Sequence, residues 1–153
     1  MHGMTLIELL IGIVITGILL AAAAPPFADY IRNSKLRESG NVLVIQTLAA
    51  QGEAIRRNAT ISLVTSNNAI SIVDPSTAVV LRRHDVSADV SMGANTFAFG
   101  SDGRPTPVGT SYSINLSMAG FTCNAENRCP GLRVTSGGAV RLCRDHTNSS
   151  DCP

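Results

Sequence analysis

The residues that could do chemistry in this chain lie near its two ends. At the N-terminal end, Glu8 is a lone carboxylate, and the twenty residues from Leu9 to Ala28 carry no charge. About twenty apolar residues are what a helix needs to cross the core of a bilayer. An ionised side chain in such a helix costs roughly 2.5–3.5 kcal/mol, so it usually marks a function or a partner. We infer from the sequence that Glu8 needs a counter-charge and that its own helix supplies none.

At the other end, all four cysteines fall in the last 31 residues. An even number of cysteines crowded into an exported domain indicates two disulfides. A zinc site is disfavoured because no CxxC pair is present. Short loops close at low entropic cost, which favours the pairs Cys123–Cys129 and Cys143–Cys152. The crossed pairing, Cys123–Cys152 with Cys129–Cys143, would tie the C-terminus to the domain and remains an alternative.

No residues have the pattern of an enzyme active site. His84-Asp85 and Asp145-His146 are adjacent pairs, and neighbours on a strand point to opposite faces. The chain has no GxSxG elbow, no P-loop and no HExxH motif. We therefore expect a non-enzymatic protein without cofactor or metal, and we expect both histidines to lie in solvated strand ends or loops.

Length and composition fit one domain and an anchor. The chain has 153 residues, a net charge of +1 and 4% aromatic residues. That length accommodates one compact domain in addition to the apolar segment. So few aromatic residues argue against a nucleic-acid module that stacks bases.

The first third of the chain has helical periodicity. It predicts one long helix from about Met4 to Arg57, kinked at Pro25, although Pro25 and Pro26 in tandem could also break it. The apolar residues expected to pack against the rest of the domain share one helical face. They are Phe27, Ile31, Val42, Ile45, Leu48, Gly52 and Ile55.

From Thr60 onward the apolar period changes to two, which is typical of strands. Turn residues separate the runs, for example Asn67-Asn68, Pro75-Ser76, 101–105 and 136–138. The sequence therefore predicts an α+β fold in which an antiparallel β-sheet packs on the helix. The predicted strands are 61–66, 69–74, 77–83, 86–92, 95–101, 111–117, 132–136 and 139–144.

The string GMTLIELLIGIVITGILLAAAAPPF, which begins at Gly3, resembles the N-terminal signal of type IV prepilins and type II secretion pseudopilins. In that family a prepilin peptidase cuts after the glycine and N-methylates the new terminal residue. The resemblance implies that residues 1–3 are a leader and that Met4 becomes the methylated terminus. It also implies that 4–24 span the inner membrane and later form the filament core, with a helix-kinking Pro25.

Two other interpretations of the N-terminus fit the residues less well. A secretory signal peptide would have a basic n-region, where this chain has only His2. A plain transmembrane anchor fits the length but leaves Glu8 unexplained. The prepilin resemblance implies that Glu8 meets the free N-terminal amine of a neighbouring subunit. Opposite charges in apolar surroundings attract strongly, whereas either one alone is costly.

Three further strings extend the resemblance along the chain: QGEAIRRNATISLV, FGSDGRPT and GGAVRLCR. They are similar to the GspH/FimT group of minor pilins and pseudopilins, whose globular part is a helix packed on two β-sheets. The resemblance implies a pilin-like fold with a long helix over 4–58. Residues 59–153 would then form a β-rich periplasmic domain.

The resemblance leads to three functional hypotheses. The first is a minor type IV pilin that acts in pilus assembly or initiation, first as a single-pass inner-membrane protein and then among other pilins in a filament. The second is a minor pseudopilin of a type II secretion system. The third is a DNA-binding minor pilin for natural transformation. A GRxR-type motif serves that role in related proteins, but Ala139 replaces its first arginine here, and the phosphate contacts would be Arg133, Arg141 and Arg144.

Overall fold

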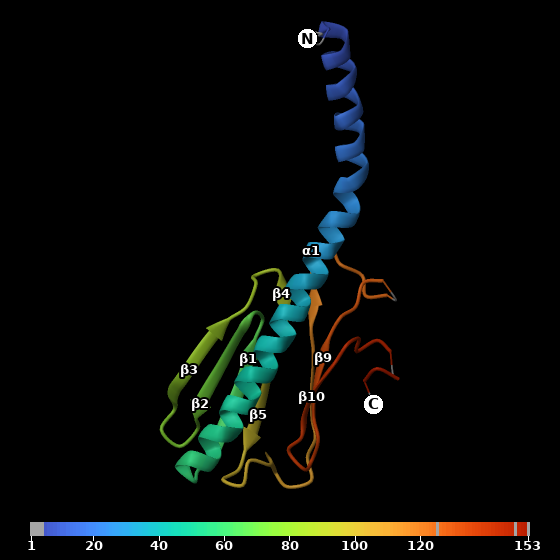
Figure 1. Cartoon of the computed structure of the whole chain (residues 1–153). Helices are drawn as coiled ribbons and strands as arrows, with labels where there is room; N and C mark the ends of the chain where they lie inside the picture. Colours follow the sequence, from blue (N-terminus) through green and yellow to red (C-terminus); the bar gives the residue numbers. More distant parts are fainter. Residues whose placement is uncertain (1–4, 125, 149, 153) are drawn as a thin grey trace. The chain divides into compact units, whose positions relative to one another are not determined.

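The computed structural model describes residues 5–124, 126–148 and 150–152. For residues 22–26 it describes the backbone only. It contains one long helix, α1 (Leu6–Arg57), followed by ten strands (Figure 1). The strands are β1 (Ile61–Ser66), β2 (Ala69–Asp74), β3 (Val79–Asp85), β4 (Val90–Ser91), β5 (Asn95–Phe99), β6 (Pro105–Thr106), β7 (Tyr112–Asn115), β8 (Ser117–Met118), β9 (Gly131–Val134) and β10 (Val140–Cys143).

The chain divides into two compact units, Met1–Arg32 and Asn33–Pro153. The described part of the first unit is helical from Leu6, and α1 continues through Pro25 and Pro26, so the tandem prolines do not end the helix. Among the residues that the structure describes, no helical stretch has the length and apolar content needed to cross a bilayer. Part of the predicted span, namely residues 4 and 22–24, lies outside the described side chains.

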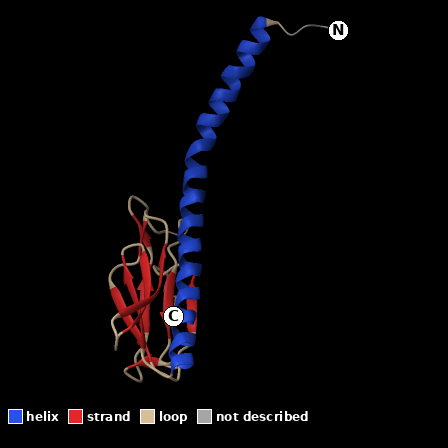
Figure 2. Ribbon diagram, turned by 90° about the vertical axis from the view of Figure 1, so that its left-hand side faces the viewer, coloured by secondary structure: helices blue, strands red, loops and turns tan. Residues whose placement is uncertain are grey.

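The second unit contains the rest of α1 and three antiparallel sheets (Figures 1 and 2). A five-stranded sheet has the order β3-β2-β1-β5-β6, a three-stranded sheet has the order β10-β9-β7, and β4 pairs with β8. The register places Leu63 opposite both Ile72 and Phe97. All three side chains are buried, and they form one row of the core. The prediction of an α+β fold with antiparallel sheet on the helix is confirmed.

The prediction of which helix face packs on the sheets is wrong for most of its residues, although Val42 is half-buried against the core. Ile45, Leu48 and Ile55 are more than half exposed. The buried positions are Leu36, Ser39, Gly40, Leu43, Gln46, Thr47, Ala50, Gln51 and Ala54. Close approach is the physical reason, because a Cβ built on Gly40 would lie only 3.1 Å from Leu142 Cδ1. Small and hydrogen-bonding residues fit such a contact, and hydrophobicity alone does not reveal it.

Two predicted strands also differ from the structure. In the segment 86–92 only Val90 and Ser91 form a strand, because the Val86 amide donates to the Asn68 carbonyl instead of joining a ladder. The segment 111–117 divides at Leu116, whose amide donates to the Pro130 carbonyl, so β7 and β8 join different sheets. Most other strands fall within two residues of their predicted positions.

The cysteines form the two local disulfides that loop length favoured. Cys123 is bonded to Cys129 and Cys143 is bonded to Cys152. The first bridge closes the loop before β9, and the second holds the C-terminal segment to the end of β10. Cys129 is fully buried. The disulfides therefore stabilise the side of the domain that carries the three-stranded sheet.

Candidate functional site

Glu8 occupies the first turn of α1, where it forms a capping box with Thr5. The Thr5 backbone amide donates to Glu8 Oε2 at 3.1 Å, and the Thr5 hydroxyl donates to the same oxygen at 3.2 Å. In return, the Glu8 amide donates to Thr5 Oγ1 at 3.3 Å. Reciprocal bonds of this kind satisfy two backbone donors that a helix N-terminus otherwise leaves free.

The capping box gives Glu8 two hydrogen-bond donors from Thr5, and both are neutral. The Glu8 carboxylate makes no ion pair with any described residue. The spacing Thr5-x-x-Glu8 is the recognised signature of a capping box, so the sequence alone could have revealed it. Gly3 and Met4, the predicted processing residues, and the side chain of Pro25 lie outside the described residues.

The three-stranded sheet brings two of the predicted DNA-contact residues together. Arg141 on β10 lies directly opposite Arg133 on β9, and Arg133 lies opposite Ser113 on β7. In the adjacent row, Leu132 is fully buried and Leu142 lies close to Gly40 of α1. Since alternate residues of a strand point to opposite faces, both arginines lie on the face directed away from the helix.

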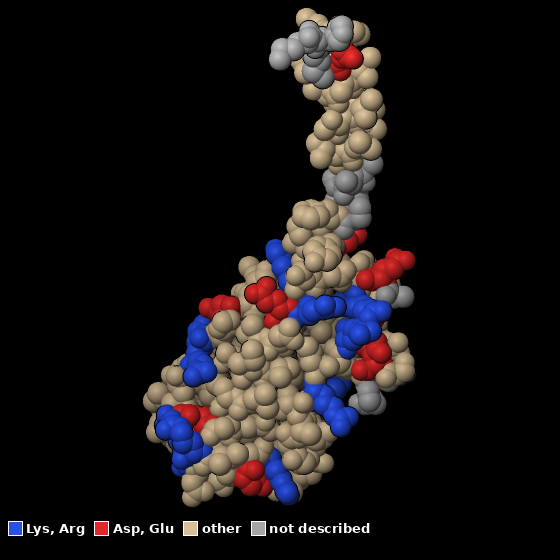
Figure 3. All heavy atoms as spheres, in the orientation of Figure 1, with Lys and Arg blue, Asp and Glu red and all other residues tan. Residues whose placement is uncertain are grey.

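The third arginine of that set is placed differently. Arg144 follows the last residue of β10 and is exposed, but it is not paired in the ladder. Arg133 is half-buried, and its Nη1 donates to Asn115 Oδ1 and to the Leu132 carbonyl, each at 2.9 Å. On the surface shown in Figure 3, basic and acidic side chains are interspersed over the strand-bearing unit rather than gathered in one basic patch.

Gln51, the first residue of the string QGEAIRRNATISLV, joins the two other strings to α1. The buried Gln51 side-chain amide donates to the Gly103 carbonyl at 2.9 Å and to the Gly138 carbonyl at 2.8 Å. Gly103 belongs to the FGSDGRPT string and Gly138 to GGAVRLCR. Both glycines have positive φ values, of 75° and 89°, which favour glycine. Gln51 therefore fastens a turn from each of the two larger sheets to the helix.

His146 lies in a loop as predicted, but it is half-buried rather than solvated, and its neighbour Asp145 is buried. Asp145 is buried and accepts hydrogen bonds from the Thr147 amide at 3.0 Å and its hydroxyl at 2.7 Å. Burial raises the pKa of Asp145, but these bonds outweigh it and the pKa lies below its ordinary value. The half-buried His146 contacts the Cys129 carbonyl, with ring Nδ1 at 2.9 Å. His84, by contrast, is exposed at the end of β3 as expected.

These contacts dock the C-terminal segment on the three-stranded sheet. A Cβ built on Gly131 would lie 2.9 Å from both Arg133 Nη1 and His146 Cβ. The absence of a side chain at Gly131 therefore lets the segment after β10 approach the sheet. Among the described residues, no group of three or more His, Cys, Asp or Glu side chains could hold a metal ion.

A long N-terminal helix, an antiparallel β-domain packed on its second half and a disulfide-bonded C-terminal region together form a pilin-like fold. The family described as the prokaryotic N-terminal methylation motif matches residues 1–24. No curated protein matches the chain.

The fold is similar to that of the type IV minor pilin FimU of Pseudomonas aeruginosa, known in two crystal forms. One FimU structure aligns with a TM-score of 0.60 and 20% identity over 74% of this chain and 91% of FimU. The other aligns with a TM-score of 0.56 and 19% identity over 69% of this chain and 90% of FimU. The chain therefore combines a prokaryotic N-terminal methylation motif with a fold similar to that of a minor type IV pilin.

Proposed function

We propose that this protein is a minor subunit of a type IV pilus that acts in pilus assembly or initiation. The observation that carries the proposal is the combination of an N-terminal methylation motif with a FimU-like domain in one chain. The exposed apolar side chains of residues 6–21 support it, because a surface of this kind usually meets a membrane or another protein.

In the proposed pathway, prepilin peptidase cleaves after Gly3 and methylates Met4. The apolar helix first anchors the protein in the inner membrane, with the domain in the periplasm, and then enters the filament core. There the carboxylate of Glu8 pairs with the terminal amine of a neighbouring pilin. The ion pair compensates two charges that would each be costly in an apolar environment.

The charge pairing of Glu8 can be tested separately from its part in the capping box. Glutamine at position 8 can still bond to the Thr5 amide, so Glu8→Gln removes the charge and keeps the cap. We expect Glu8→Gln and Glu8→Ala to reduce incorporation into sheared filaments about equally, as measured by immunoblot against the amount in the membrane fraction. Thr5→Ala weakens the cap but keeps the charge, and it serves as the control that still incorporates. Wild-type incorporation of Glu8→Gln would refute the charge pairing.

The type II secretion alternative has the same architecture and a different phenotype. Deletion of a minor pilin should abolish or reduce surface pili and leave protein secretion intact. Deletion of a minor pseudopilin should do the reverse. Counting surface filaments and measuring secreted protein in the same deletion strain therefore separates the two functions.

The register of Arg133 and Arg141 favours DNA binding as a second candidate function. Two guanidinium groups opposite each other on one face can contact neighbouring phosphates, which gives weak, salt-sensitive and sequence-independent binding. In a mobility-shift titration at low salt, we expect a weak shift that decreases in Arg141→Gln. Arg83→Gln, on a different sheet, is the matched control. A shift that Arg141→Gln leaves unchanged would exclude this face.

A further inference from the structure

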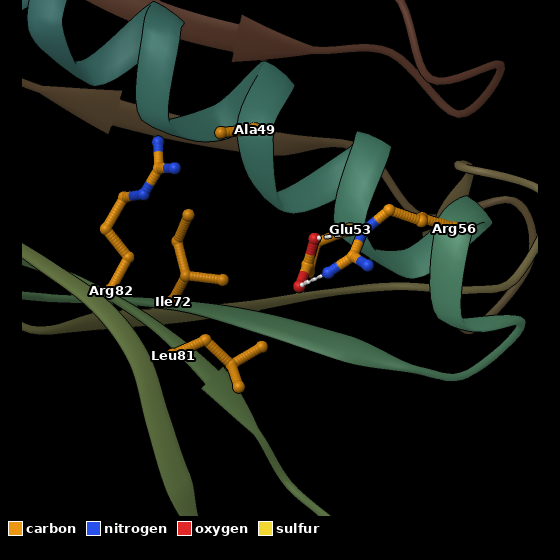
Figure 4. Close-up of a pocket in the computed structure, with 6 residues that line it drawn as sticks. All are labelled: Ala49, Glu53, Arg56, Ile72, Leu81 and Arg82. Atoms are coloured by element: carbon orange, nitrogen blue, oxygen red, sulfur yellow. Dashed lines mark hydrogen bonds and ion pairs between the residues drawn. The ribbon is translucent and has the colours of Figure 1, made fainter.

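A groove lies between the second half of α1 and the β2–β3 hairpin (Figure 4). Its volume is about 170 Å³. Three apolar residues and three charged residues line it. They are Ala49, Ile72 and Leu81, and Glu53, Arg56 and Arg82.

A bulge between the two strands shapes the groove. Ile72 lies opposite Arg82 and Val73 lies opposite Val80, so Leu81 is an extra residue on β3. A bulge re-aims side chains and bends its strand. Here Leu81 becomes part of the groove lining together with the buried Ile72. The apolar part of the groove therefore depends on the irregular register of β3.

The negative charge of the groove is already paired. Glu53 accepts hydrogen bonds from Arg56 Nη2 at 2.6 Å and Nε at 3.0 Å, and from Arg57 Nε at 2.7 Å. The bonds from Arg56 and Arg57 lower the pKa of Glu53 to about 2. Two guanidinium groups thus hold a single carboxylate that stays ionised near neutral pH.

Arg82 is the charge of the groove that remains uncompensated. Its side chain makes no hydrogen bond or ion pair with any residue in the described part of the chain. Figure 4 shows it extending from β3 toward α1, beside Ile72. The neighbouring Arg83 projects from the opposite face of the strand, where it pairs with Asp85 at 3.0 Å. An unpaired guanidinium beside an apolar surface is complementary to a carboxylate on an aliphatic stem.

We propose that this groove binds a glutamate side chain carried by an extended segment of another protein. The methylene groups of the glutamate cover Leu81 and Ala49 next to the buried Ile72, and its carboxylate meets Arg82. β3 is one of the two edge strands of its sheet, and Val79 and Val80 are 51% and 54% exposed, so the segment can lie along it. A bare phosphate would leave the apolar surface uncovered. The proposal goes beyond filament membership and does not depend on it.

The test uses the full chain, ¹⁵N-labelled and held in detergent micelles, titrated with two peptides. One is acetyl-Ala-Val-Glu-Val-Ala-amide, and the other has glutamine in place of glutamate, which keeps the shape and removes the charge. In ¹H–¹⁵N correlation spectra, we expect saturable shifts at Ile72, Leu81 and Arg82 with the glutamate peptide. The glutamine peptide should bind about fivefold more weakly, as for an exposed ion pair.

Two variants on the same strand complete the design. Arg82→Gln should remove the preference for glutamate over glutamine, whereas Arg83→Gln should retain it. Raising the ionic strength to about 1 M, where the Debye length is about 3 Å, should also reduce the preference. Equal affinity for the two peptides, a preference that survives in Arg82→Gln, or no saturable shift at the groove would each overturn the proposal. The spectra themselves report whether each variant is folded.

Discussion

Two parts of α1 use the same backbone conformation for opposite purposes. In residues 6–21, every leucine, isoleucine and valine is between 48% and 81% exposed. In residues 33–57, Leu36 and Leu43 are buried beside polar side chains that have partners. Thr47 donates to the Leu43 carbonyl, and Gln51 donates to two turns. Among the described residues, no buried side-chain nitrogen or oxygen lacks a hydrogen-bond partner.

The difference shows that hydrophobicity and burial are separate properties in this helix. The second part packs on its own domain, so its buried face can be small and polar where the sheet approaches closely. The first part has no such surface in the chain's own described contacts, and a large exposed apolar area of this kind indicates an external partner. Ile45, Leu48 and Ile55 on the second part show the same separation of hydrophobicity from burial, because they are apolar and exposed.

The largest expected effect separates a core leucine from two exposed leucines of the same helix. Leu43→Ala removes a fully buried side chain, and we expect it to lower the free energy of unfolding by about 2–5 kcal/mol. Leu48→Ala and Leu10→Ala should each change it by less than about 0.5 kcal/mol. Guanidinium denaturation in a non-denaturing detergent, followed by circular dichroism, measures all three. A cost for Leu48→Ala similar to that for Leu43→Ala would remove the contrast between the two faces.

A smaller effect is expected at the polar contact of the buried face. Gln51→Leu has a similar size but leaves the carbonyls of Gly103 and Gly138 without their donor. We expect it to lower the free energy of unfolding by about 1–3 kcal/mol, the usual cost of an unsatisfied buried group. Hydrogen exchange should accelerate in both turns together. The exposed Asn41→Leu is the control, and acceleration in only one turn would contradict the proposed double contact.

In the first part of α1, the expected effect is local. Thr5→Ala removes the N-cap hydroxyl, which costs about 1 kcal/mol in a typical helix. We expect faster amide exchange over residues 5–9 and no change in the unfolding of the strand-bearing unit. A drop in the stability of that unit would mean that the two parts of the helix unfold together.

The smallest effect concerns the exposed ion pairs near the end of α1. The pKa of Glu53 is lowered in the folded chain, so its contribution to stability is present above the unfolded value near 4.5 and is lost as the pH falls toward 2. Glu53→Gln should reduce the pH dependence of unfolding in that range, with a small destabilisation at pH 7 that disappears as the pH falls toward 2. An unchanged acid transition in this variant would contradict the paired state of Glu53.

Several features of the fold could be read from the residues in order. Alternating β-branched runs separated by turn residues predicted most strands, and short loops between cysteines favoured the observed disulfides. The capping box of Thr5 and Glu8 was also readable, since it depends only on a spacing of three residues. The burial of Asp145 was not, because its environment includes Cys129, which is distant in the sequence.

The sequence by itself determined the long helix, the antiparallel β-domain and the isolated carboxylate at Glu8, because these follow from local period, spacing and charge. Only the tertiary structure decided which helix face packs on the sheets, that Gln51 holds two turns, and that Arg82 lies unpaired beside an apolar groove. Each of these depends on distances between segments far apart in the chain. Hydrophobicity along the sequence shows which side chains would gain from burial. The packing of α1 on the sheets decides which of them are buried.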